Sequence, residues 1–68
     1  MRLVEFVGAE GGEKGHVLYL NVDLVEAVWE PPGCLAGACQ LNFLSGAAWR
    51  VNGTAATVAV RLAKGAKP

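Results

Sequence analysis

Up to Thr54 the chain consists of short apolar segments separated by glycine, proline, asparagine and aspartate. Turn-forming residues at such close intervals leave little room for a helix, whereas strands of about five residues fit between them. The segments rich in β-branched and aromatic residues are residues 2–7, 16–20, 24–30, 38–44 and 47–51. They predict an antiparallel β-meander of four to five strands.

The alternation of side chains predicts which face of each strand is buried. Val25, Ala27 and Trp29 are expected on the inner side of the third strand, with Val28 on the outer side. A two-residue turn at Ser45-Gly46 would mix polar and apolar side chains on both faces of the last hairpin. A three-residue turn with Gly46 in the left-handed region instead places Leu41 opposite Trp49, so this register is expected.

A helix is predicted for residues 55–64, where the chain contains neither glycine nor proline. Thr54 is a suitable N-cap and Gly65 a suitable C′ residue. The helical repeat places Ala55, Val58, Ala59 and Leu62 on the face that should cover the sheet. The expected fold is therefore α+β, a single domain over residues 1–68 with one C-terminal helix packed on the sheet.

The chain has more apolar side chains than one small subunit can bury. Of its 68 residues 53% are apolar and 18% charged, yet a chain of this size buries only about 60% of its unfolded surface. The second strand has no polar face, and the helix carries apolar residues on its back. A non-enzymatic, homo-oligomeric structural or regulatory module is expected, with the interface residues Val17, Tyr19, Val28, Val60 and Ala56.

Charge is distributed unevenly although the net charge is zero. All six acidic residues lie in residues 1–30, whereas residues 31–68 contain four basic residues and no acidic one. One interpretation is that cations near the helix end complement the helix dipole and are otherwise solvated. The alternative is a nucleic-acid-binding regulator, and its candidate anion contacts are Arg50, Arg61, Lys64 and Lys67.

Residue types that carry catalysis or bind cofactors are sparse. Ser45 is the only serine and His16 the only histidine, so a catalytic residue in one chain would have no evident partner. An enzyme whose site is shared between subunits and joins His16 to Cys34 or to a carboxylate is the least favoured alternative. The glycine-rich residues 8–15 lack the Gly-Lys-Ser/Thr sequence of a phosphate-binding loop. We therefore expect no enzyme activity, no catalytic residues and no cofactor.

Two cysteines, Cys34 and Cys39, lie five positions apart. Zinc would need about two more ligands, so no metal site is expected. A local disulfide and two reduced thiols both remain open, and the absence of a secretion signal favours thiols. The longest uncharged stretch, residues 31–49, begins with Pro-Pro-Gly and cannot span a bilayer as one helix. The sequence thus predicts a cytoplasmic protein with no membrane segment.

From about residue 18 to residue 62 the chain resembles the short flagellar-operon proteins of the FlbD type. The resemblance rests on YLNVDLVEAV (Tyr19 to Val28), LNFLSGAAWRV (Leu41 to Val51) and the capped C-terminal helix. It implies a β-meander closed by a helix and supplies no catalytic or ligand residues. The chain departs from that family in the helix sequence NGTAATVAVRL and in the PPGCLAGA loop, which looks inserted. The resemblance bears on the fold alone.

Overall fold

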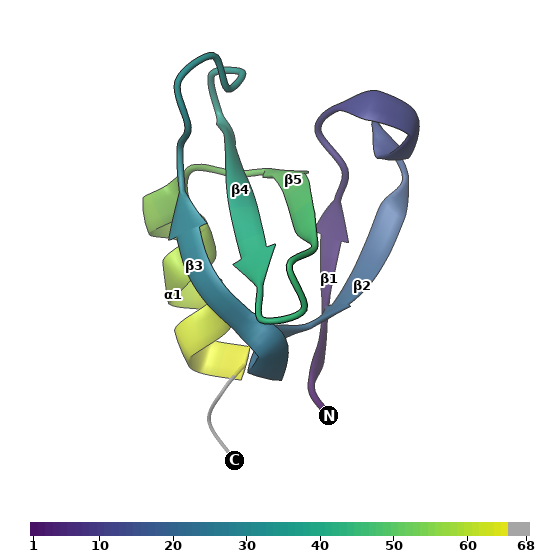
Figure 1. Ribbon diagram of the computed structural model, residues 1–68, viewed down its shortest axis with the longest axis vertical. Coiled ribbons are helices and arrows are strands. Elements are labelled where there is room, and N and C mark those ends of the chain that lie inside the picture. The colour runs from purple at the N-terminus through teal and green to yellow at the C-terminus, as the bar shows by residue number, and fades with distance from the viewer. Residues whose placement is uncertain (66–68) are drawn as a thin grey trace.

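The computed structural model describes residues 1–65 and places five strands and one C-terminal helix in the predicted order (Figure 1). The observed strands differ from the predicted ones only at their ends. Their bounds are β1 Leu3–Val7, β2 Val17–Asn21, β3 Val25–Trp29, β4 Ala38–Phe43 and β5 Ala48–Asn52. Two short 3-10 helices, η1 (Gly11–Glu13) and η2 (Val22–Leu24), and the helix α1 (Ala55–Gly65) complete the fold. The α+β class is confirmed.

The strands divide at η2 into two antiparallel sheets. β1 pairs with β2, and β3, β4 and β5 form a three-stranded meander. Figure 1 shows β2 and β3 on opposite sides of the molecule, with η2 carrying the chain between them. The two sheets meet where β1 ends beside β5: Gly8 forms a bridge with Val51, and the Ala9 N–H donates to the Arg50 carbonyl at 2.9 Å.

The hairpin between β4 and β5 has the predicted register. Leu41 lies opposite Trp49, and the Phe43 N–H donates to the Ala47 carbonyl at 2.9 Å. The Gly46 N–H donates to the Phe43 carbonyl at 2.9 Å, and Gly46 has a φ of 94°. This conformation closes the three-residue turn and favours glycine over any residue with a Cβ.

β3 contains a bulge at Glu26, after which the inward and outward sides of the strand are exchanged. The predicted assignment of inner and outer residues is therefore wrong beyond Glu26. Val25 lies opposite Phe43 while Ala27 lies opposite Asn42, so Glu26 is an extra residue in the ladder. An extra residue exchanges the two faces for all that follows. Val28 consequently packs against the core, and Trp29 is exposed.

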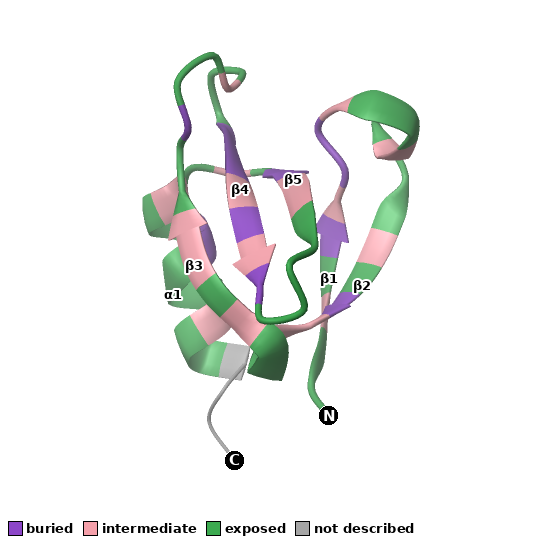
Figure 2. Ribbon diagram, in the orientation of Figure 1, coloured by how far each residue is buried: buried purple, intermediate pink, exposed green. Residues whose placement is uncertain are grey.

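The core lies between the two sheets and α1 (Figure 2). Its fully buried side chains come from every layer: Phe6, Cys39, Leu41, Val51 and Val58. α1 covers β3 and β4 with Val58, Leu62 and Ala55, as its apolar repeat predicts. Ala59, which was expected on the same face, is exposed.

Candidate interaction surface

The largest exposed apolar residues of the β1–β2 pair lie on its outer face. The inner face carries Phe6 and Leu20, which are buried. Because successive side chains of a strand point to opposite faces, the alternate residues form a second, outward row. We call this row the ribbon face; it consists of Leu3, Glu5 and Val7 of β1 and Val17, Tyr19 and Asn21 of β2.

The ribbon face leaves several apolar side chains in contact with water. Leu3, Val17 and Tyr19 are 54%, 53% and 62% exposed. Tyr19 lies opposite Glu5, and its hydroxyl is 3.5 Å from the Glu5 Oε1 atom. Glu5 is therefore the one charged residue in a row that is otherwise apolar except for Asn21 at its end. Burial of the exposed half of each apolar side chain would contribute about 1 kcal/mol.

β2 also has an unpaired backbone edge within residues 1–65, because its single neighbour is β1. The Gly8 N–H donates to the His16 carbonyl and the Val22 N–H to the Arg2 carbonyl, each at 2.9 Å. Hydrogen-bonded and non-hydrogen-bonded pairs alternate in an antiparallel ladder. The N–H and C=O groups of Val17 and Tyr19 therefore point away from β1, toward the open side, whereas the carbonyl of Asn21 is engaged as the N-cap of η2.

The two outer edges of the molecule differ in their protection. The edge of β3 carries the Glu26 bulge, a second acidic residue at Glu30, and Pro31 directly after it. Bulges, charges and proline are features that prevent an edge strand from pairing with another chain. β2 has none of these from Val17 to Asn21. Of these two edges, as formed by residues 1–65, the edge of β2 is therefore the less protected against pairing.

The other predicted interface residues lie elsewhere. Val60 is 54% exposed and Ala56 is also exposed, both on α1. α1 lies beside β3 and β4, and β2 lies at the opposite side of the molecule (Figure 1). Val28 was expected on the outer surface, but it packs against the core because of the Glu26 bulge. The predicted interface residues that are exposed therefore lie in two separate places: Val17 and Tyr19 on β2, and Ala56 and Val60 one helical turn apart on α1.

The predicted anion-contact residues do not form one patch among residues 1–65. Arg50 donates from Nη1 to Glu10 Oε2 at 2.6 Å and from Nε to Gln40 Oε1 at 3.1 Å. Arg61 donates to the Glu5 carbonyl from α1, with its guanidinium carbon 4.6 Å from the centre of the Phe6 ring.

These contacts give both arginines a partner within the chain. Lys64 is exposed in the last turn of α1, where a cation complements the helix dipole. Lys67 lies outside the described residues. Of the three predicted anion-contact residues that the structure describes, Arg50 and Arg61 are therefore engaged in contacts within the chain.

The exposure of Trp29 was not expected from the sequence. Trp29 lies opposite Gln40, and Gln40 lies opposite Arg50, so the indole begins a row across the outer face of β3, β4 and β5. Gln40 also donates from Nε2 to Oδ1 of Asn42, the next outward residue along β4, at 2.8 Å. A bulge at an ordinary glutamate has no sequence signature, so nothing in the sequence would have revealed this face.

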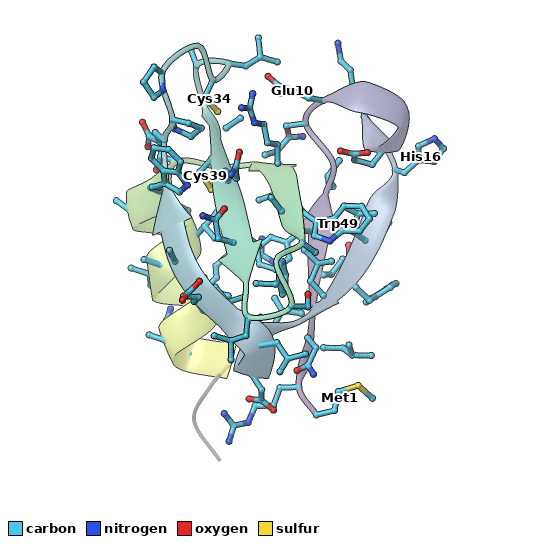
Figure 3. All side chains as sticks on the ribbon, in the orientation of Figure 1. Met1, Glu10, His16, Cys34, Cys39 and Trp49 are labelled. Carbon is cyan, nitrogen blue, oxygen red and sulfur yellow. The ribbon has the colours of Figure 1, made fainter. Side chains whose placement is uncertain are left out.

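The two cysteines are free thiols on the approach to β4 and within it (Figure 3). Cys39 is buried, and burial raises the pKa of its thiol, with Cys34 and the Glu30 carboxylate adding to the increase. A buried thiol with a raised pKa behaves as a small apolar side chain. Within residues 1–65 no group of three histidine, cysteine or acidic side chains is placed to hold a metal ion.

No family model, curated protein or solved structure matches this chain. The resemblance to the FlbD-type proteins thus stays a prediction from the sequence. Among residues 1–65 no helix has the length and apolar character to cross a membrane. Likewise, no pocket opens on the surface formed by these residues. The ribbon face and the adjoining edge of β2 are therefore the strongest candidate for a functional site.

Proposed function

We propose that this protein is a small non-enzymatic module that associates with copies of itself through the ribbon face and the edge of β2. The single observation that carries the proposal is the exposure of Val17 and Tyr19 on a strand that has only one neighbouring strand, β1, among residues 1–65. Each feature alone is common on a protein surface. Together they supply both apolar area and directional hydrogen bonds to an incoming chain.

The location of the protein in the cytoplasm is part of this proposal. It rests on the sequence pattern, and the free thiols of Cys34 and Cys39 fit a reducing compartment. The role of the assembly is structural or regulatory. A dimer formed through a surface strand would carry two copies of the remaining surface of the protein.

Molar mass in solution tests the proposal. Sedimentation equilibrium over a range of concentrations is expected to give a mass that rises above the 7.1 kDa of one chain. A mass that stays at the monomer value up to near-millimolar concentration would contradict self-association. The measurement needs no ligand or partner.

A matched pair of variants locates the interface. Val17→Lys places a charge on the ribbon face next to the open edge, and Val60→Lys places the same charge on α1. The two valines are almost equally exposed, at 53% and 54%, so the substitutions carry similar direct costs. Val17→Lys is expected to give a monomer and Val60→Lys to associate as the wild type does. If Val60→Lys is monomeric and Val17→Lys still associates, the interface lies on α1 instead.

A further inference from the structure

We draw no further inference here: the strongest candidate, the outer face of β3, β4 and β5 on which the exposed Trp29 lies in one row with Gln40 and Arg50, is an unpartnered surface, and nothing in the structure shows what covers it.

Discussion

At the scale of single residues, Gly8 holds the junction between the two sheets. Its N–H donates to the His16 carbonyl and its carbonyl accepts from the Gly15 N–H, both at 2.9 Å. Beyond these bonds it bridges to Val51 of β5. A Cβ at this position would collide with the backbone carbonyl of Glu13. Glycine is required here for close approach of two backbones, whereas the sequence indicated only that residues 8–15 form a loop.

The substitution Gly8→Ala is therefore expected to lower the free energy of unfolding by about 1–3 kcal/mol, the usual cost of overpacking. Gly12→Ala is the matched control, because a Cβ on Gly12 meets nothing within 4 Å. The control should change stability by no more than about 0.5 kcal/mol. Urea unfolding followed by tryptophan fluorescence measures both. Equal stabilities for the two variants would show that the loop relaxes around the added methyl group.

Residue environments could be predicted from the sequence only where the strand pattern was regular. The exposure of Val17 and Tyr19 follows from a strand with no polar face, and the structure leaves both exposed. The contact of Arg61 with the Phe6 ring joins residues far apart in the chain. It depends on how α1 is placed relative to β1, and a single sequence carries no information on that placement.

At the scale of elements, the turn between β4 and β5 was predictable and the bulge in β3 was not. The turn combines a glycine at the left-handed position with a register that alone separates the polar and apolar faces, so two independent constraints agree. The bulge arises because Val25 packs inward beside Phe43 while Val28 packs inward beside Leu41. Two inward residues three positions apart need one extra residue between them, which only the packed core reveals.

The start of α1 depends on β3 as well as on its own N-cap. Thr54 Oγ1 accepts from the Thr57 N–H at 3.2 Å, as expected for an N-cap. In addition, Glu30 Oε2 accepts from the Ala55 N–H at 2.8 Å. A carboxylate at this position also interacts favourably with the helix dipole. Glu30 thereby ties the end of β3 to the first turn of the helix.

Replacement of this carboxylate is expected to weaken the helix start. Glu30→Gln keeps an oxygen acceptor but removes the charge, so it should lower the free energy of unfolding by about 0.3–1 kcal/mol at low salt. Glu26→Gln is the control, since Glu26 lies in the bulge of the same strand and does not bond to α1. The difference between the two variants should shrink at high salt because ions screen the dipole. If the two variants are equally stable at low salt, the charge of Glu30 does not stabilise the helix.

At the scale of the whole molecule, the small size of the chain links stability to association. A core built from few fully buried side chains leaves little stability in reserve. The ribbon face keeps three large apolar side chains in water in the single subunit. Association that buries them adds to the free energy of unfolding by mass action. Folding and assembly of this protein should therefore be coupled.

The coupling predicts a melting temperature that depends on protein concentration. Above the dissociation constant of a dimer, each tenfold rise in concentration adds about 0.7 kcal/mol per chain, which corresponds to a rise of about 3–6 °C for a domain of this size. Val17→Lys should melt at one temperature at all concentrations, because its charge blocks the ribbon face. Val60→Lys should keep the wild-type dependence. Differential scanning calorimetry over a hundredfold range of concentration distinguishes these results. A wild-type melting temperature that does not change with concentration would show that folding is not coupled to assembly.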